Sequence, residues 1–290
     1  MSPAADPGSL LATRLGEIAA AIPDGSLSVA VFDCLAGRGW HYNGDRWFHA
    51  ASTIKIAVMA AVFDAIDAGR FAPASRVAVR NHFRSAADGL PFRVPAGRDA
   101  DAGVYDTLGR TMRVVDLVRH MIGNSSNLAT NLLLDVTGVE AARASLASRG
   151  VEGVDLQRGV EDDRAHQAGC NNRVTANGLV ALLRAIHDAT AFSAASTQAM
   201  IDALLDQRFA GAIAPGLPDA VRAAARIAHK TGDISTASHD AGIVFLPDRL
   251  PYVVALLAES DGDASARNNA ITAASRVVYD VVALAGDGPA

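Results

Sequence analysis

Hydrophobic positions along the chain repeat with two periods, which separate expected helices from expected strands. Apolar residues at helical spacing predict helices over 10–22, 114–120, 126–136, 141–148, 175–187, 194–205 and 271–285. Runs rich in branched residues predict strands at 26–32, at GWHYNG after the turn at 37–39, and at RIAHKTG, AGIVFLP and PYVVALLAE. The order of hairpin, helices, three strands and helix predicts an antiparallel sheet built from both chain ends, with an all-α lobe inserted.

The segments between these elements differ in character. Residues 52–68 are apolar almost all round, which predicts a helix buried at the centre of its surroundings. Residues 71–112 are polar and interrupted by Gly and Pro, so we expect a long surface excursion. Residues 151–174 predict a long loop, of a kind that is often functional. We therefore expect a sheet lobe of 1–48 and 190–290 and an all-α lobe of 49–189, forming one structural unit, with a frayed tail at 286–290.

Composition excludes several classes of function. The net charge is -5 and no basic stripe is present, so we expect neither a nucleic-acid partner nor a polybasic membrane anchor. The longest apolar runs are too short to span a bilayer. The N-terminal residues form no signal-peptide pattern, which predicts the cytoplasm, although a secreted chain without its leader would look the same. We expect a monomer with a small-molecule substrate.

The sequence also lacks the signatures of metal and cofactor chemistry. The eight histidines show no ligand spacing. Cys34 and Cys170 match no zinc or redox spacing and are expected to be thiols. No H-E-x-x-H, G-x-S-x-G, Walker A or G-x-G-x-x-G motif is present. We therefore predict no metal and no cofactor.

Lysine is almost absent. The 26 Lys and Arg residues include only two lysines, Lys55 and Lys230. A buried lysine can lose its proton, whereas an arginine cannot. In the stretch ASTIK, Ser52 precedes Lys55 by three residues, so a helix places both on one face. Lys55 could act as a base toward the Ser52 hydroxyl. The alternative is that Ser52 caps the helix and Lys55 extends to the surface.

Two further stretches carry candidate chemistry. GNSSN places Ser125 and Asn127 in a turn that enters a helix, where they could relay a proton and bind an amide, or simply cap the helix. HKTG places Lys230, Thr231 and Gly232 at the end of a strand. Gly232 would let a substrate approach the backbone. The alternative for Lys230 is an ordinary lysine on an edge strand.

In the order S-x-x-K, S-x-N, K-T-G, these stretches resemble the penicillin-recognising serine enzymes, and class A β-lactamases in particular. The motifs lie about 70 and about 100 residues apart, which suits class A, and MIGNSSNLATNLLLD is especially similar to that family. The resemblance covers roughly residues 10–285. It implies an α+β fold with a five-stranded antiparallel sheet flanked by helices, plus the inserted all-α lobe.

The resemblance also implies a role for each matching residue. Ser52 would be the acyl-accepting nucleophile, activated by Lys55, and Ser125 would pass a proton to the leaving nitrogen. Asn127 would hold the amide side chain of the substrate. The carboxylate of the substrate would be held by Lys230 and Thr231. The backbone N–H groups of Ser52 and Asp233 would form the oxyanion hole. Asn131 would tether the long loop.

Three departures from the family pattern bear on these roles. The family's E-x-x-L-N pattern is absent; Glu161 is the best-placed candidate for the base that removes the acyl group, or else an ordinary loop acid. Ser126 stands where class A enzymes usually have Asp. Asp233 brings a negative charge toward the expected carboxylate pocket, a possible bar to ordinary penicillins. His239 could line this edge or be a structural histidine, and no arginine is identified as an assistant to Lys230.

Three functions remain open from the sequence. The first is a class A-like β-lactamase that acts through an acyl-enzyme on Ser52. The second is a cytoplasmic esterase, amidase or acyltransferase of the same fold with little or no β-lactam turnover. The third is a penicillin-binding sensor that is acylated once and stays blocked. Deacylation separates the first from the third, and Asp233 bears on the choice between the first and the second.

Overall fold

The computed structural model describes residues 6–286, so most of the predicted frayed tail lies outside the described part of the chain. The chain divides into two compact units. Unit 1 comprises Met1–Thr53, Val174–Arg184 and Ala210–Ala290, and unit 2 comprises Ile54–Arg173 and Ala185–Phe209. Of the predicted site residues, Ser52 therefore falls in unit 1 and Lys55 in unit 2.

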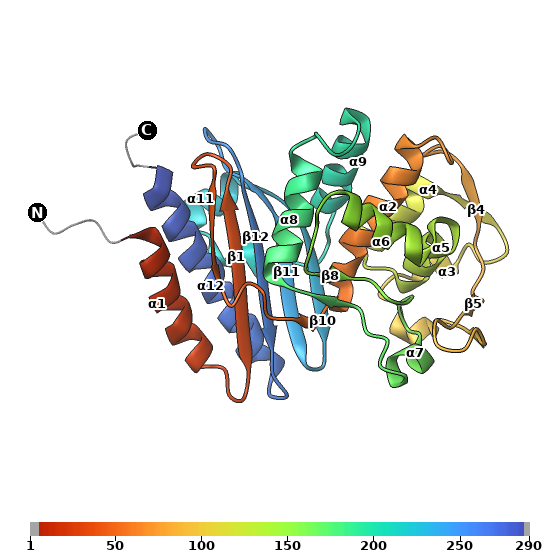
Figure 1. The fold of residues 1–290 in the computed structure, drawn as a ribbon, viewed down its shortest axis with the longest axis horizontal. Coiled ribbons are helices and arrows are strands. Elements are labelled where there is room, and N and C mark those ends of the chain that lie inside the picture. The colour runs from red at the N-terminus through yellow and green to blue at the C-terminus, as the bar shows by residue number, and fades with distance from the viewer. Residues whose placement is uncertain (1–5, 287–290) are drawn as a thin grey trace, which may run out of the picture. The chain divides into compact units, whose positions relative to one another are not determined.

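Unit 1 contains the predicted five-stranded antiparallel sheet, with strand order β10-β11-β12-β1-β2 (Figure 1). Its strands come from both ends of the chain: β1 (Ser26–Asp33), β2 (Arg38–Tyr42), β10 (Arg226–Ile234), β11 (Ala237–Phe245) and β12 (Tyr252–Glu259). The interior strands β11 and β12 are buried almost throughout. In β12 this burial explains the nearly continuous apolar sequence, whereas β11 also buries the polar side chains of Ser238, His239 and Asp240. The predicted α+β fold is confirmed.

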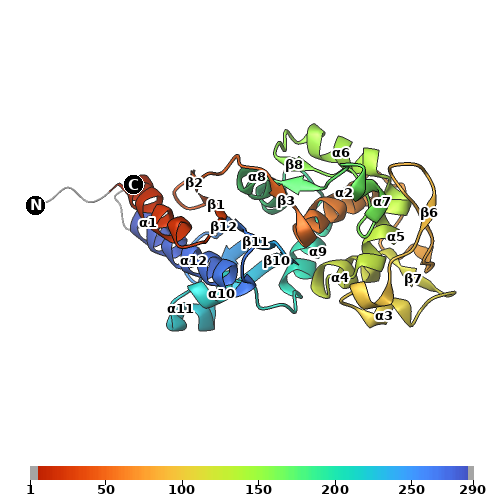
Figure 2. The same cartoon turned by 90° about the horizontal axis from the view of Figure 1, so that it is seen from below.

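Two long helices cover one face of this sheet: α1 (Pro7–Ala20) and α12 (Ala264–Gly286) lie side by side (Figures 1 and 2). The short helices α10 (Ile213–Gly216) and α11 (Asp219–Ala224) precede β10. Leu11 and Leu15 of α1, together with Val277, Val278 and Val281 of α12, pack into one hydrophobic core with the sheet. This burial supplies most of the stabilisation of the sheet.

Helix α2 (Lys55–Asp67) is the centre of unit 2, where other helices pack around it. Nine of its apolar residues are buried, which confirms the prediction from its all-round hydrophobicity. The helices that surround it are α4 (Val114–Gly123), α5 (Asn127–Thr137), α6 (Val139–Ser148) and α9 (Ala194–Leu205). Among the described residues, no helix combines the length and the apolar character needed to cross a membrane.

The two predicted irregular segments contain short elements. Between α2 and α4 lie β4 (Arg76–Ala78), β5 (Phe83–Arg84), β6 (Pro91–Phe92), the 3-10 turn η2 (Ala96–Arg98), α3 (Ala102–Tyr105) and β7 (Thr111–Arg113). The segment after α6 contains β8 (Val154–Asp155), α7 (Asp163–Gln167) and β9 (Arg173–Val174), and leads to α8 (Ala176–His187). The helix predicted over 52–68 starts later than expected. Strand β3 (Phe48–His49) leads into the 3-10 turn η1 (Ala51–Ile54), which contains Ser52, and α2 starts only at Lys55.

Candidate active site

The turn that carries Ser52 is held by local hydrogen bonds. Ala51 adopts a left-handed backbone with φ of 46°, an uncommon conformation for a residue with a side chain. Its N–H donates to Nδ1 of His49 at 3.0 Å, and the Thr53 hydroxyl donates to the Ala50 carbonyl at 2.6 Å. The backbone before Ser52 is therefore fixed in a strained conformation, as is common at functional sites.

Strand β10 passes directly against this turn. A Cβ added at Gly232 would lie 3.1 Å from Thr53 Cγ2, 3.2 Å from Ala51 Cβ and 3.3 Å from the Ser52 backbone nitrogen. Glycine thus permits the close approach of β10 to Ser52. Two residues earlier, Lys230 is fully buried and its Nζ donates to the Thr231 carbonyl at 3.0 Å. Unit 1 therefore brings the Ser52 end of the first motif next to the third motif.

A second layer in unit 1 supports the same turn. His239 pairs with Gly232 across the β10–β11 ladder, and its Nε2 bonds the His49 carbonyl at 2.9 Å. The ring meets Phe48 edge-on. Burial lowers the pKa of His239 to about 4, so the imidazole is neutral at ordinary pH. This arrangement favours the structural interpretation of His239.

Asp233 follows Gly232 in β10, and its Oδ1 accepts from the Ser238 hydroxyl at 3.2 Å. Partial loss of hydration raises the pKa of Asp233, and the hydrogen bond opposes that rise. Asp233 is thus the residue directly after Gly232, at which β10 approaches the Ser52 turn. The predicted oxyanion-hole role of the Asp233 N–H stays a prediction.

In unit 2, Lys55 lies against the turn of the second motif. Its Nζ donates to the Ser125 carbonyl at 2.8 Å, to the Ser125 hydroxyl at 3.1 Å and to Asn127 Oδ1 at 2.7 Å. Lys55 is fully buried and does not extend to the surface. Burial lowers its pKa to about 7, against the opposing effect of the Asp99 and Glu161 charges. A lysine with this pKa is a competent base near neutrality.

The helix cap of the second motif is Ser126 rather than its neighbours. Its hydroxyl accepts from the Ala129 N–H at 3.1 Å and donates to Asp99 Oδ2 at 3.2 Å. The same carboxylate oxygen accepts from the Leu128 N–H at 2.7 Å. Asp99, which the sequence did not single out, thus braces the turn in which Ser126 replaces the expected Asp. Ser125, with φ of 58°, directs its hydroxyl toward Lys55 instead.

Glu161 belongs to the same cluster. Its Oε1 accepts from Asn127 Nδ2 at 3.0 Å, and its Oε2 pairs with Arg98 Nε at 3.1 Å. Burial raises the pKa of Glu161, and the Arg98 charge opposes that rise. The preceding residue is fixed by Asn131, which exchanges two hydrogen bonds with the Val160 backbone at 2.8 and 2.9 Å. Asn131 therefore tethers the long loop in the way that the resemblance implied.

The predicted site residues thus form two sets. Unit 1 holds Ser52 with the β10 residues Lys230, Thr231, Gly232 and Asp233, and unit 2 joins Lys55, Ser125, Asn127 and Glu161. Arg98 and Asp99 were not among the predicted site residues, since both lie in the segment 71–112 that was expected to run along the surface. Their only signal in the sequence was the charged stretch RDADA between Gly97 and Gly103.

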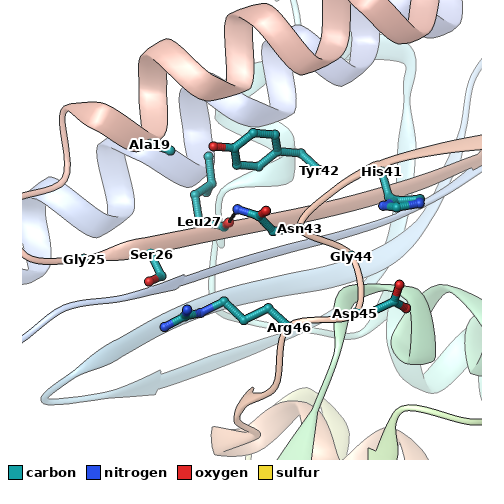
Figure 3. Close-up of a pocket in the computed structure, with 10 residues that line it drawn as sticks. All are labelled: Ala19, Gly25, Ser26, Leu27, His41, Tyr42, Asn43, Gly44, Asp45 and Arg46. Carbon is teal, nitrogen blue, oxygen red and sulfur yellow. Dashed lines mark hydrogen bonds between the residues drawn. The ribbon is translucent and has the colours of Figure 1, made fainter.

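A separate hollow of about 560 Å³ in unit 1 contains none of these residues (Figure 3). Ala19, Gly25, Leu27 and Tyr42 line part of it. The imidazole of His41, the carboxylate of Asp45 and the guanidinium of Arg46 also line it, and all three residues are exposed. We assign it no ligand.

A sheet formed by both chain ends, a helical unit around a buried lysine and the three motifs in order define the penicillin-recognising class of proteins. The chain belongs to the Beta-lactamase enzyme family, whose model matches residues 10–282. This membership and the shared fold suggest a hydrolase.

Known relatives are similar over nearly the whole chain. Beta-lactamase AER-1 of Aeromonas hydrophila is 26% identical over 261 residues, covering 89% of this chain and 81% of its own. The beta-lactamase of Sphaerobacter thermophilus superposes with a TM-score of 0.80 at 29% identity, covering 95% of this chain and 98% of its own. A mutant of PBP-A in an acyl-enzyme complex with penicillin-G gives 0.79 at 25% identity, covering 94% and 96%.

Proposed function

We propose that the protein is a serine hydrolase that forms an acyl-enzyme on Ser52, and that its reaction is β-lactam hydrolysis. The observation that carries this proposal is Lys55, fully buried and in hydrogen-bond contact with both Ser125 and Asn127. Burial brings its pKa to about 7, which suits a base at neutral pH. An ordinary lysine on a helix keeps its ammonium group in water at the surface.

In the acylation step, neutral Lys55 accepts the Ser52 hydroxyl proton, directly or through a water molecule. The Ser52 oxygen attacks the lactam carbonyl carbon, and the carbon–nitrogen bond then breaks. Ser125 delivers a proton to the leaving nitrogen and receives in exchange the proton that Lys55 took from Ser52, which returns Lys55 to its neutral form. The strained turn at Ala51 supports this role for Ser52, because it fixes the backbone N–H that would face the developing oxyanion.

Substrate binding would fall to the third motif and to Asn127. Lys230 and Thr231 are proposed to hold the carboxylate of the substrate, and Gly232 lets β10 lie close to the Ser52 turn. The side chain of Asn127 is proposed to hold the substrate amide. Asn127 Oδ1 and Nδ2 already bond Lys55 and Glu161, so substrate binding would be coupled to both proposed bases.

In the deacylation step, Glu161 takes a proton from water, and the hydroxide attacks the ester carbonyl carbon. The tetrahedral intermediate collapses, the Ser52 oxygen leaves, and it regains the proton that Glu161 took from the water, which restores the ionised carboxylate. The hydrogen bond from Asn127 to Glu161 supports this assignment over that of an ordinary solvated loop acid. The raised pKa of Glu161 is consistent with a group that must accept a proton.

Asp233 favours a second candidate. A carboxylate directly after K-T-G would repel the carboxylate that ordinary penicillins carry. An esterase, amidase or acyltransferase that accepts an uncharged substrate would tolerate it. A sensor that is acylated once by penicillin is the third candidate, and it requires Glu161 to be inactive.

Intact-mass spectrometry over time, after mixing with a penicillin and a chromogenic cephalosporin, tests these proposals. Ser52→Ala removes the nucleophile, and Ser235→Ala, an exposed serine of the β10–β11 turn, is the matched control. We expect turnover in the wild type and the control and none in Ser52→Ala. A lasting adduct on the wild type would favour the sensor. Absence of both adduct and turnover would favour the ester or amide hydrolase.

A further inference from the structure

The two carboxylate oxygens of Glu161 are held by different parts of unit 2. Asn127, which contacts Oε1, belongs to the second motif. Arg98, which contacts Oε2 through Nε, comes from η2 and belongs to none of the motifs. An opposite charge on one oxygen favours the ionised form of the carboxyl group, and a donor on each oxygen fixes its orientation.

Arg98 is itself anchored to the second motif. Its carbonyl accepts from Asn127 Nδ2 at 2.7 Å, and its N–H donates to the Pro95 carbonyl at 2.9 Å. The next residue, Asp99, accepts from Ser126 and Leu128. The backbone of Arg98 is thus fixed on both sides, although its side chain is about half exposed.

The segment that carries Glu161 does not supply this partner. Four residues after Glu161, where the family pattern E-x-x-L-N ends in an amide, the chain has Ala165, which is buried and carries no side-chain donor. The donors to the Glu161 carboxylate that the structure shows, Asn127 and Arg98, both come from outside the loop.

We propose that Arg98 is a positioning residue that keeps the Glu161 carboxylate ionised and turned toward Asn127. This inference rests on the proposed function where it concerns deacylation, because Glu161 is there the base that activates water. Arg98 does not touch the reacting atoms in this scheme and acts only through Glu161.

The charges around Glu161 determine in which direction each substitution should shift its pKa. Asp163 competes for Arg98, since its two oxygens lie 3.2 and 2.9 Å from Arg98 Nη1. Asp163 also raises the pKa of Glu161, whereas Arg98 lowers it. The other charged or titratable groups whose fields involve Glu161 are Lys55, Arg158 and Tyr105. Removing Arg98 should therefore raise the pKa of Glu161, and removing the Asp163 charge should lower it.

A titration of the full chain tests this without reference to activity. The protein is labelled with ¹³C at the carboxyl groups, and Glu161→Gln identifies the Glu161 signal. We expect Arg98→Gln to raise the Glu161 pKa by about half to one unit. The shift should not be larger, because solvent screens the charges of a partly exposed pair. Asp163→Asn should lower it, and Arg98→Lys should restore most of the wild-type value. Arg164→Gln, which breaks an exposed pair with Asp88, is the matched control and should change nothing.

The second readout is the pH dependence of deacylation, measured by decay of the acyl-enzyme of a penicillin. In Arg98→Gln the acidic limb of the deacylation profile should move to higher pH by the same half to one unit. At a given pH on that limb, the deacylation rate should fall about three- to tenfold. The acylation rate at about pH 8 should stay within about twofold. An unchanged Glu161 pKa in Arg98→Gln would overturn the proposal, and so would a loss that Arg98→Lys fails to restore.

The outcomes distinguish this inference from the proposed function. If no probe acylates the wild type, the proposed function fails, and the titration alone decides whether Arg98 sets the Glu161 pKa. If the pKa moves but the deacylation profile does not follow, Glu161 is not the base, and the catalytic part of the inference is overturned with it.

Discussion

Lys55 has lost the hydration that normally keeps a lysine protonated at neutral pH. Because burial brings its pKa to about 7, we predict that the acylation rate rises as pH increases through about 7. Lys55→Arg should lower acylation at least about a hundredfold, since guanidinium keeps its proton. Stopped-flow measurement of adduct formation between about pH 5.5 and 9 checks both effects.

The second lysine supplies the control. In the proposed function, Lys230 binds the carboxylate of the substrate through its positive charge and transfers no proton. Lys230→Arg keeps that charge. We expect it to raise KM while the midpoint of the acylation profile stays at about 7. A profile without an inflection near 7 in the wild type would contradict the role of Lys55 as a base.

His239 makes the stability of unit 1 depend on pH. Its folded pKa is about 4, below the ordinary value of 6.5, so the unfolded chain binds the proton more strongly. The stability is fully present above about 6.5 and is lost as pH falls toward 4, by about 2–3 kcal/mol at pH 4.5. Urea unfolding at several pH values, compared with His239→Gln, measures the loss.

In His239→Gln we expect the dependence between about pH 6.5 and 4.5 to flatten by this amount. The exposed His41→Gln serves as the control and should retain the wild-type slope. Equal slopes in all three proteins would mean that His239 is not buried in a neutral form.

At the scale of elements, periodic sequence predicted most of the fold. The helix predicted over 194–205 has the same ends in the structure, and the sequence predicted each strand of the five-stranded sheet. Helix α12 begins at Ala264, seven residues before the predicted start, because its first turns are polar. These polar turns are nevertheless packed, because Arg267 is fully buried there. An arginine is almost never fully buried, so the pattern of polar residues did not predict this packing.

The candidate site shows the same limit. The motifs identified Ser52, Lys55, Ser125 and Lys230, because each combines a reactive side chain with a characteristic spacing. Arg98 and Asp99 could not be found in this way. They act through contacts with residues about thirty to sixty positions away, and such contacts leave no periodic signal in a single sequence.

Arg267 joins α12 to the turn between β10 and β11. Its guanidinium donates to the carbonyls of Ser235 at 2.8 Å, Ser260 at 2.9 Å and Gly262 at 2.7 Å. We predict that Arg267→Met lowers the free energy of unfolding by about 2–3 kcal/mol, since it removes all three of these hydrogen bonds and leaves the buried Ser260 carbonyl without its donor. Arg267→Lys should cost less, because it keeps some donors.

Urea denaturation measures these losses. Arg276→Met, which breaks an exposed pair with Asp280 on the same helix, is the control and should cost less than about 1 kcal/mol. If Arg267→Met and Arg276→Met had similar effects, the buried contacts of Arg267 would contribute no more than a surface ion pair.

At the scale of the whole molecule, the chain does not complete one unit before it begins the other. Unit 1 consists of three segments and unit 2 of two, so the backbone crosses between them four times. The sequence predicted lobes of 1–48 with 190–290 and of 49–189 as parts of one structural unit, and these boundaries stay a prediction. Helix α9 is informative here, because it follows residue 189 and yet packs on α2 and α4 within unit 2.

Leu204 and Val278 allow a direct comparison, since both are fully buried, one in α9 and the other in α12. Each alanine substitution should cost about 2–4 kcal/mol through the cavity that it leaves. We predict that Leu204→Ala reduces hydrogen-exchange protection first in α2 and α4, and that Val278→Ala reduces it first in β11 and β12, which α12 contacts. Hydrogen exchange with mass spectrometry on the full chain resolves the two patterns. Equal loss of protection in all four elements for both variants would mean that the chain opens only as a whole. In that case neither the predicted lobes nor the two compact units would be folding units, and the four crossings would couple them into one.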